Sequence, residues 1–281
     1  KTSLSIELAK RIKGEIISCD SMQIYKDMTI GTAKPTVEEM DGIPHHLIDF
    51  VLPSERYSVA DFKKAATQKI EEILSRNKIP IIVGGTGLYV DALVYNIEYL
   101  ELETDLKYRQ ELENLIEQKG LEELYEKAKQ IDEQAMQSIS KNDKKRIMRV
   151  LEIYHQTGKT KTQLEAESRL TPPPYDYIVF AITMDREKLY ERINRRVDIM
   201  IEQGLIEEVQ NLVNKYKEFP TAMQGLGYKE VVEYIEGETT KEEMIEKLKM
   251  ETRRYAKRQL TWFRKNKNIK WIDRFSTIRT K

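Results

Sequence analysis

The sequence predicts an α/β fold, with a parallel sheet as the core and an all-helical segment inserted into it. Strand-like apolar runs alternate with helical patterns in the first hundred residues, and each run ends in a Gly- or Asp-bearing turn. From about residue 105 to about residue 168 the pattern is helical throughout. Alternating strands and helices form parallel sheets, whose ligands bind at the carboxyl ends of the strands. We therefore expect the chemistry of this chain to lie at those strand ends.

The elements follow from local signals. Ser58 is a suitable N-cap, because Asp61 stands three residues later in front of an apolar helical stripe. The first part of the chain is expected to contain a helix at 3–12, a strand at 15–19, a helix at 58–77, a strand at 80–83 and a helix at 88–93.

The domain organisation follows from a change of periodicity after residue 100. We predict a core made of residues 1–100 and 176–281, and a helical insertion at 101–175. A strand at 177–184 should return to the sheet. The remainder from about residue 186 should be helical, with 271–273 as a last short strand.

Composition narrows the class of protein. The 281 residues are 40% hydrophobic and 33% charged, which is typical of a globular protein with one large or two modest domains. The longest apolar runs are too short to cross a bilayer, so no membrane association is expected. Cys19 is the one cysteine, which excludes an intrachain disulfide and a cysteine-based zinc site. It also favours a reducing, cytoplasmic location.

The chain begins with Lys1-Thr2 in front of a helical pattern. A Lys-Thr pair that opens a helix is how a phosphate-binding P-loop (G-x-x-x-x-G-K-[ST]) ends. The glycine half of that motif would precede Lys1, so we expect it to lie outside the printed sequence. Taken alone, the pair is more typical of a solvated lysine and an N-cap threonine.

Asp20 follows the strand expected at 15–19. Near a P-loop lysine, this carboxylate could bind Mg²⁺ or act as a general base toward an acceptor. The alternative is an aspartate that caps a turn. Ser21 and Gln23 add donors and acceptors that could contact a base edge.

The Gly84-Gly-Thr-Gly turn follows the next strand. Its backbone N–H groups and the Thr86 hydroxyl could bind an anion, or its glycines could serve tight packing. Further along, Arg192 and Arg196 share a helix face at a spacing of four residues, which suits a pyrophosphate or an RNA backbone. Ion pairing with neighbouring acids is the alternative for these arginines.

His45 and His46 have no third ligand at a metal-like spacing, so we interpret His46 and Asp49 as structural hydrogen-bonding groups.

Basic residues gather at the C-terminal end. Between residues 253 and 281 there are eleven Lys or Arg residues and one acid, and Tyr255, Trp262 and Phe263 are interleaved with them. Charge beside aromatic rings suits RNA. The alternative is a basic amphipathic helix whose rings face the core. We expect both in part, with Tyr255, Leu260 and Phe263 packed inside.

Taken in order, these segments resemble the tRNA dimethylallyltransferase (tRNA isopentenyltransferase) family. The matching residues cover nearly the whole chain: Lys1-Thr2, Asp20-Ser-Met-Gln-Ile-Tyr-Lys, Gly31-Thr-Ala-Lys-Pro, Pro44-His-His-Leu-Ile-Asp, Tyr57-Ser, Val83-Gly-Gly-Thr-Gly-Leu-Tyr, Asn142-Asp with Arg146 and Arg149, Gly225-Leu-Gly-Tyr-Lys-Glu and Tyr255-Ala-Lys-Arg-Gln-Leu-Thr-Trp-Phe-Arg.

The resemblance implies a fold and a reaction. The fold would be a P-loop NTPase-like parallel sheet core with an all-helical insertion that contacts the tRNA anticodon stem-loop. The enzyme would transfer a dimethylallyl group from dimethylallyl diphosphate to N6 of the adenosine 3′ of the anticodon, releasing pyrophosphate. Mg²⁺ would assist the diphosphate, and the enzyme is expected to be monomeric.

The resemblance also implies residue roles. Lys1, Thr2 and Arg196 would hold the diphosphate, with Thr2 also able to bind Mg²⁺. Asp20 would accept a proton from the attacking amine, and Thr86 would hydrogen-bond the bridging oxygen of the leaving group. Residues expected to contact the tRNA are Asp20, Ser21, Met22, Gln23, Thr86, Arg109, Lys145, Arg146, Arg149 and Arg258.

Two differences from the family pattern stand out besides the P-loop glycines. Lys145 stands before Arg146 where the family pattern has glutamine, a change that keeps a donor. A C-terminal Cys₂His₂ zinc module, found in eukaryotic relatives, cannot be built from Cys19 alone, which favours a bacterial-type enzyme.

Two other functions remain open from the residues. One is a small-molecule or nucleoside P-loop kinase, in which Asp20 activates a hydroxyl for attack on ATP. It explains Lys1-Thr2, but it does not explain the basic aromatic segment or the helical insertion. The other is a non-catalytic RNA-binding protein on a decayed P-loop fold.

Overall fold

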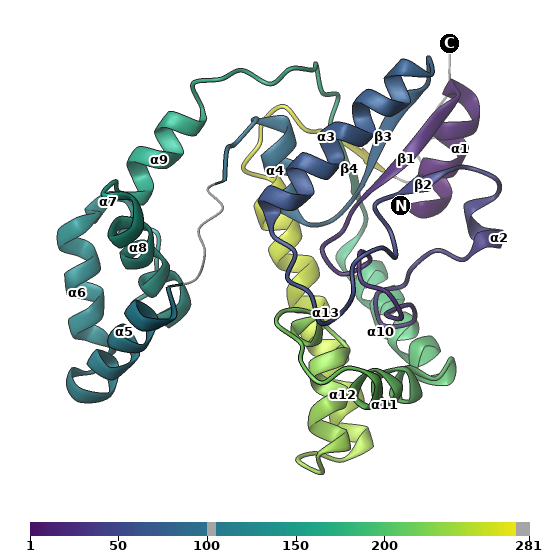
Figure 1. The fold of residues 1–281 in the computed structure, drawn as a ribbon. Helices are drawn as coiled ribbons and strands as arrows, with labels where there is room; N and C mark the ends of the chain where they lie inside the picture. The colour runs from purple at the N-terminus through teal and green to yellow at the C-terminus, as the bar shows by residue number, and fades with distance from the viewer. Residues whose placement is uncertain (100–104, 274–281) are drawn as a thin grey trace. The chain divides into compact units, whose positions relative to one another are not determined.

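The computed structural model describes residues 1–99 and 105–273 (Figure 1). The chain divides into two compact units, one formed by Lys1–Val90 with Asp176–Lys281 and the other by Asp91–Tyr175. The first residues of the expected insertion, 101–104, and the basic residues Arg274, Arg279 and Lys281 lie outside the described residues.

The core of the first unit is a parallel sheet of three strands, in the order β2 (His45–His46), β1 (Gly14–Cys19) and β3 (Ile79–Gly84). Cys19 is paired with Gly84, so β1 and β3 end level with each other. The predicted parallel sheet is therefore confirmed, and the segments that follow these two strands begin side by side.

Two helices pack against this sheet. α1 (Thr2–Ile12) contributes Ile6 and Ala9 to a small core with Ile16 of β1. α3 (Val59–Ser75) begins at the predicted N-cap, Ser58, whose hydroxyl accepts the Asp61 backbone N–H while the Asp61 side chain accepts that of Ser58. β1 is buried along its whole length, as expected for a strand with helices packed against it. The short α2 (Val37–Met40) and α4 (Gly87–Val94) complete this part of the chain.

The strand predicted at 177–184 is shorter and pairs elsewhere. β4 (Phe180–Thr183) forms a two-stranded parallel sheet with β5 (Lys270–Asp273), in which Ala181 is opposite Trp271. Within the described residues β4 is not paired with the three-stranded sheet, so its predicted return to that sheet is wrong. A short apolar run predicts a buried strand but carries no information about which strand it pairs with. The predicted last strand at 271–273 is confirmed by β5.

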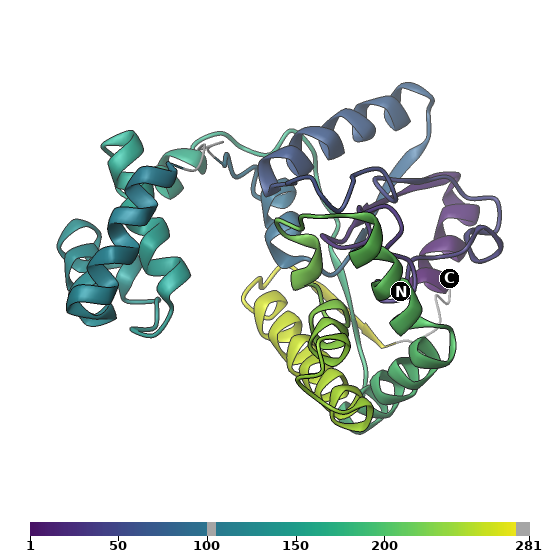
Figure 2. The ribbon, with the colours of Figure 1, turned by 60° about the horizontal axis from the view of Figure 1, so that its bottom comes forward.

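Helices from α10 onward pack together in the first unit, at the bottom of Figure 2. They share one apolar core with the loop after β1, which contributes Ile24, Tyr25 and Met28. The elements are α10 (Arg186–Glu202), α11 (Leu205–Lys215), the 3₁₀ turn η1 (Ala222–Gln224), α12 (Tyr228–Ile235) and α13 (Lys241–Phe263).

The second unit is helical, as predicted for this part of the chain. It has its own apolar core, built around Leu124, Ile147 and Leu151. Its elements are α5 (Leu106–Lys119), α6 (Leu121–Ile131), α7 (Glu133–Met136), α8 (Lys144–Thr157) and α9 (Lys161–Ser168).

Candidate active site at the strand ends

Asp20 and Thr86 stand just beyond the carboxyl ends of the paired strands β1 and β3. The Thr86 hydroxyl accepts a hydrogen bond from the Ser21 backbone N–H at 3.0 Å, and it lies 3.3 Å from the Ser21 hydroxyl. Asp20 and Thr86 were both expected at the carboxyl ends of parallel strands, and the structure brings their two turns into contact. The Ser21–Thr86 contact fixes the position of the segment that carries Asp20.

Asp20 itself caps the turn that follows it. One carboxylate oxygen, Oδ1, accepts the backbone N–H groups of Met22 at 2.9 Å and Gln23 at 3.3 Å. This is the turn-capping role considered from the sequence. It uses one oxygen, so the second oxygen can also serve a chemical role.

The glycines of the Gly84-Gly-Thr-Gly turn serve close packing. The N–H groups of Gly85 and Thr86 donate to the Cys19 carbonyl at 3.2 and 3.3 Å, so these two groups are already satisfied within the protein. A methyl group on Gly84 would lie 1.9 Å from the same carbonyl oxygen. Of the two alternatives that the sequence left open, the structure supports packing rather than anion binding by these amides.

Lys1 lies at the same end of the sheet. Its Nζ is 3.4 Å from the Gly84 carbonyl oxygen, and a Cβ on Gly85 would meet it at 3.0 Å. Although the residue as a whole is exposed, desolvation of its amine lowers the pKa of Lys1. Asp20 opposes this effect, because its charge raises that pKa, and Arg196 lowers it further. The structure thus groups Lys1, Asp20 and Arg196 electrostatically.

Arg196 comes from α10 and is exposed. Among the described residues, it takes part in none of the ion pairs with neighbouring acids that were the alternative to a ligand role. One of those acids, Asp198, pairs instead with Lys249 at 2.8 Å.

Tyr255 and Gln259 of α13 complete this group, a role that was not predicted from the sequence. The amide of Gln259 donates to the Gly85 carbonyl at 2.8 Å. Burial, together with the charge of Asp20, raises the pKa of Tyr255, while hydrogen bonds to Gln259 and Thr86 lower it. Tyr255 was expected only to pack inside. The available signal was its four-residue spacing from Gln259, which puts both on one helix face.

The next turn of α13 packs on the start of α4. A Cβ on Gly87 would lie 2.5 Å from Cδ1 of Trp262, so the indole rests where only glycine leaves room. Arg258 is exposed, with its guanidinium 5.8 Å from the centre of the Tyr255 ring. The predicted mixture of packed rings and exposed basic groups is therefore present on this helix.

The side chains that follow Asp20 differ in the contacts they already make within the protein. Gln23 uses both ends of its amide, accepting from the Ser18 hydroxyl at 3.2 Å and donating to the Thr32 and Ala33 carbonyls at 3.2 Å each. Met22 packs against Gly225. Base contact by Gln23, implied by the resemblance, would therefore compete with three internal hydrogen bonds.

His46 and Asp49 make contacts within the protein, as predicted for structural groups. His46 lies 2.7 Å from the Glu15 carboxylate, and the buried Lys34 pairs with Asp49 and donates to the Tyr25 carbonyl. In the part of the chain that the structure describes, there is no cluster of three or more His, Cys, Asp or Glu side chains suited to hold a metal ion.

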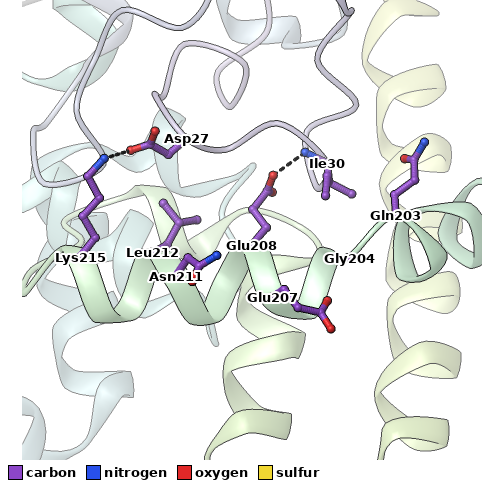
Figure 3. A pocket seen from close by; sticks show the side chains of 9 residues that line it. All are labelled: Asp27, Ile30, Gln203, Gly204, Glu207, Glu208, Asn211, Leu212 and Lys215. Atoms are coloured by element: carbon purple, nitrogen blue, oxygen red, sulfur yellow. Dashed lines mark hydrogen bonds and ion pairs between the residues drawn. The ribbon is translucent and has the colours of Figure 1, made fainter.

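A second feature of this unit is a cavity of about 600 Å³ beside α11, shown in Figure 3. At its edge the Glu208 carboxylate accepts the backbone N–H groups of Thr29, Ile30 and Gly31 at 2.9, 2.7 and 3.1 Å. The Tyr228 hydroxyl donates to the same carboxylate at 2.7 Å. An internal carboxylate therefore already occupies the N–H groups of this turn. The lining mixes the acidic Asp27, Glu207 and Glu208 and the cation Lys215 with neutral side chains such as Ile30 and Leu212.

The remaining predicted tRNA-binding residues lie in the second unit. Arg109 of α5 and Arg149 of α8 both approach the Glu152 carboxylate, at 3.7 and 3.6 Å. Arg146 pairs with Asp143 at 2.9 Å, and Lys145 is exposed. The structure thus brings Arg109 and Arg149 together, while Arg146 is held by the N-cap of its own helix.

Comparison with known proteins agrees with this fold. The IPP transferase family model matches residues 23–266. A tRNA dimethylallyltransferase of Acetivibrio thermocellus is 53% identical over 275 residues, which are 98% of this chain and 88% of the relative.

Two solved structures are also similar. The full-length tRNA isopentenylpyrophosphate transferase of Bacillus halodurans matches with a TM-score of 0.71 and 47% identity, over 97% of this chain and 86% of that one. A eukaryotic dimethylallyltransferase acting on tRNA matches with a TM-score of 0.79 and 32% identity, over 97% and 70%.

The fold and the comparisons together identify the class of protein. The core is a P-loop NTPase-like α/β fold with its polar site at the carboxyl ends of the strands. The chain belongs to the IPP transferase family. No helix in the described ranges 1–99 and 105–273 is long and apolar enough to cross a membrane.

Proposed function

We propose that this protein transfers a dimethylallyl group from dimethylallyl diphosphate to N6 of the adenosine 3′ of the anticodon in tRNA. The observation that carries the proposal is the grouping of Lys1, Asp20 and Arg196 at the strand ends of a chain 53% identical to a tRNA dimethylallyltransferase. Two cations beside one carboxylate suit a leaving diphosphate and an attacking amine.

The cations act on the leaving group. As the bond between the allylic carbon and the diphosphate oxygen breaks, negative charge grows on the departing pyrophosphate. Lys1 and Arg196 stabilise that charge, and the lowered pKa of Lys1 reflects an amine that is partly withdrawn from water. Thr86, placed beside Ser21 at the end of β3, hydrogen-bonds the bridging oxygen.

Asp20 acts on the nucleophile. The adenine N6 amine is a poor nucleophile, and its nitrogen becomes acidic as the new C–N bond forms. The Asp20 carboxylate accepts that proton, while its other oxygen keeps the turn in place through the Met22 and Gln23 N–H groups. The target base leaves the loop stack before it reaches this site.

Mg²⁺ fits this site as a companion of the diphosphate rather than as a resident metal. The described residues offer no cluster of three or more His, Cys, Asp or Glu ligands, but the Thr2 hydroxyl is an oxygen donor. Mg²⁺ binds in this way, through one or two protein oxygens together with substrate phosphates. When bound, it supplies further neutralisation of the leaving group.

The tRNA contacts come from both units. Arg109, Lys145, Arg146 and Arg149 hold the anticodon stem-loop from the helical unit, and Arg258 adds a contact from α13. We further propose that the enzyme acts as a monomer in the cytoplasm, consistent with its single buried thiol at Cys19.

The decisive experiment incubates the full-length protein with unmodified tRNA and dimethylallyl diphosphate. Mass analysis of the digested tRNA should find one adenosine heavier by a dimethylallyl group, without added ATP. ATP consumption with a nucleoside acceptor would instead support the kinase alternative. Salt-dependent tRNA binding with no product would support the non-catalytic RNA-binding protein.

A further inference from the structure

Glu152 is a buried carboxylate between two arginines of the helical unit. Its exposed fraction is 8%, and it projects from α8 toward Arg149 of the same helix and Arg109 of α5. The two arginine side chains stay 40% and 44% exposed. The carboxylate is thus inside, and both cations lie at the surface above it.

The distances show how loosely the carboxylate engages its partners. Oε1 lies 3.7 Å from Nε of Arg109, and Oε2 lies 3.6 Å from Nη1 of Arg149. Both are ion-pair distances that are too long for hydrogen bonds. Within the described residues, Oε1 has no hydrogen-bond partner although it is fully buried. Glu152 therefore attracts the two guanidinium groups but accepts no hydrogen bond from them.

Contacts beside this cluster hold helices α5 and α8 against each other. Tyr108, the neighbour of Arg109, stacks on His155 of α8 with ring centres 3.8 Å apart. His155 also lies 3.5 Å from Asp105, the N-cap of α5. These contacts hold α5 against α8, so Arg109 and Arg149 meet at one place on the surface.

We propose that Glu152 is a positioning residue for tRNA binding, which holds Arg109 and Arg149 side by side with their N–H groups directed to RNA phosphates. Two guanidinium groups brought together repel each other, and the carboxylate beneath offsets that repulsion. Their planar donor groups then match phosphate oxygens. The triad keeps one net positive charge. This inference rests on the proposed function, because it takes tRNA as the bound polyanion.

The change in charge alone and the positioning role predict opposite effects of E152Q on RNA binding, which makes the proposal testable. E152Q removes a negative charge from a basic surface, so electrostatics alone would strengthen RNA binding. If Glu152 positions the arginines, E152Q weakens binding of an anticodon stem-loop, with a Kd about tenfold higher. In turnover, KM for tRNA should rise similarly, while kcat at saturating tRNA stays within twofold of the unsubstituted protein.

Glu122 offers a matched control. It belongs to the same unit and is exposed, and its carboxylate lies 3.4 Å from Lys141. E122Q therefore makes the same charge change away from the two arginines, and its Kd should stay within twofold. A double-mutant cycle gives the second readout: in an R109Q/R149Q background, adding E152Q should change Kd no further.

The outcomes separate this inference from the proposed function. E152Q that binds as well as or better than the unsubstituted protein, or an additive effect in the double-mutant cycle, overturns the positioning role whether or not transfer occurs. Normal stem-loop binding without dimethylallyl transfer overturns the proposed function alone. Circular dichroism checks that E152Q is folded. If it is not, E152D takes its place: because its shorter carboxylate lies farther from the two arginines, its Kd should be higher than that of the unsubstituted protein, and unchanged affinity overturns the proposal.

Discussion

The Asp20 carboxylate accepts the backbone N–H of Met22 at 2.9 Å, so the proposed general base also holds its own loop. Because of this second role, the loss of activity in an alanine variant would be ambiguous. An asparagine keeps the Oδ1 acceptor for the turn and removes the charge that takes the proton.

D20N is therefore the informative substitution. We expect it to lower kcat by at least about a hundredfold, as removal of a general base does. Its tRNA affinity and its thermal unfolding temperature should stay close to those of the unsubstituted protein. Stopped assays at saturating substrates measure kcat. Filter binding measures the tRNA affinity, and calorimetry measures the unfolding temperature. Unchanged turnover would limit Asp20 to its role in the turn.

A graded series of alanines tests the packing of the Gly84-Gly-Thr-Gly turn. On Gly84 the new methyl group meets the Cys19 backbone at 1.9 Å, and on Gly87 it meets the Trp262 indole at 2.5 Å. On Gly85 it meets only the flexible side-chain ends of Gln259 at 2.3 Å and Lys1 at 3.0 Å. Overpacking costs about 1–3 kcal/mol, and more where nothing can move.

The loss of unfolding free energy should therefore decrease in the order G84A, G87A, G85A, as measured by urea denaturation. W262A provides the control for G87A. In the W262A background, G87A should lower the free energy of unfolding by less, because the indole it would meet is gone. Equal losses in all three variants would contradict close packing as the reason for these glycines.

Glu208 and Glu207 form a matched pair on one helix turn. E208Q removes the charged acceptor of three backbone N–H groups and the Tyr228 hydroxyl. It should lower the free energy of unfolding by about 1.5–3 kcal/mol, the usual value for hydrogen bonds to a charged group. Glu207 is exposed, so E207Q should change stability by less than about 0.5 kcal/mol. Comparable losses in both variants would show that the loop does not depend on this carboxylate.

Glu15 predicts a pH dependence of stability. Burial alone would raise the pKa of Glu15, but hydrogen bonds with His46 and Arg76 outweigh it and hold the pKa below its usual 4.5. A lowered carboxylate pKa contributes stability above the unfolded-state value, and this contribution is lost as the pH falls through the folded-state pKa. E15Q should therefore be less stable than the unsubstituted protein at pH 7, and the difference should shrink below about pH 4. Unfolding midpoints over pH 3–7 test this, and a constant difference would refute it.

Arg258 predicts a change in salt dependence. If its exposed guanidinium contacts a tRNA phosphate, R258A should weaken binding and reduce the slope of log Kd against log salt by about one. R254A is the control, because Arg254 is already paired with Glu251 at 2.6 Å. An unaltered slope in R258A would assign Arg258 to packing over the Tyr255 ring.

Local signals in the sequence were enough for most of the fold. The Ser58 capping box, the apolar strands before Asp20 and Gly84, and the helical periodicity after residue 105 all depend on neighbours within a few positions. The partner of β4 could not be predicted in this way, because strand pairing is decided by residues far along the chain. The same limit hid Glu208, which binds N–H groups 177–179 residues away.

The residues of the candidate site that follow the strands could be predicted from the sequence. The contacts around them were harder to predict. Asp20 and Thr86 follow from the rule that ligands of parallel sheets bind at carboxyl strand ends. The glycine turn was ambiguous, because a sequence does not show whether an N–H group already has an internal acceptor such as the Cys19 carbonyl. Tyr255 was taken for core, since an aromatic ring at helical spacing usually packs, and only the fold shows where its hydroxyl lies.

The Glu208 carboxylate joins two segments of the first unit that are distant in sequence. The loop it holds, at residues 29–31, continues from Asp20, and its own helix α11 follows α10, which carries Arg196. Separating these segments would strip three backbone N–H groups of their acceptor at once. Glu208 therefore ties the loop that continues from Asp20, the proposed general base, to the helix that follows α10, which carries Arg196, a proposed diphosphate ligand.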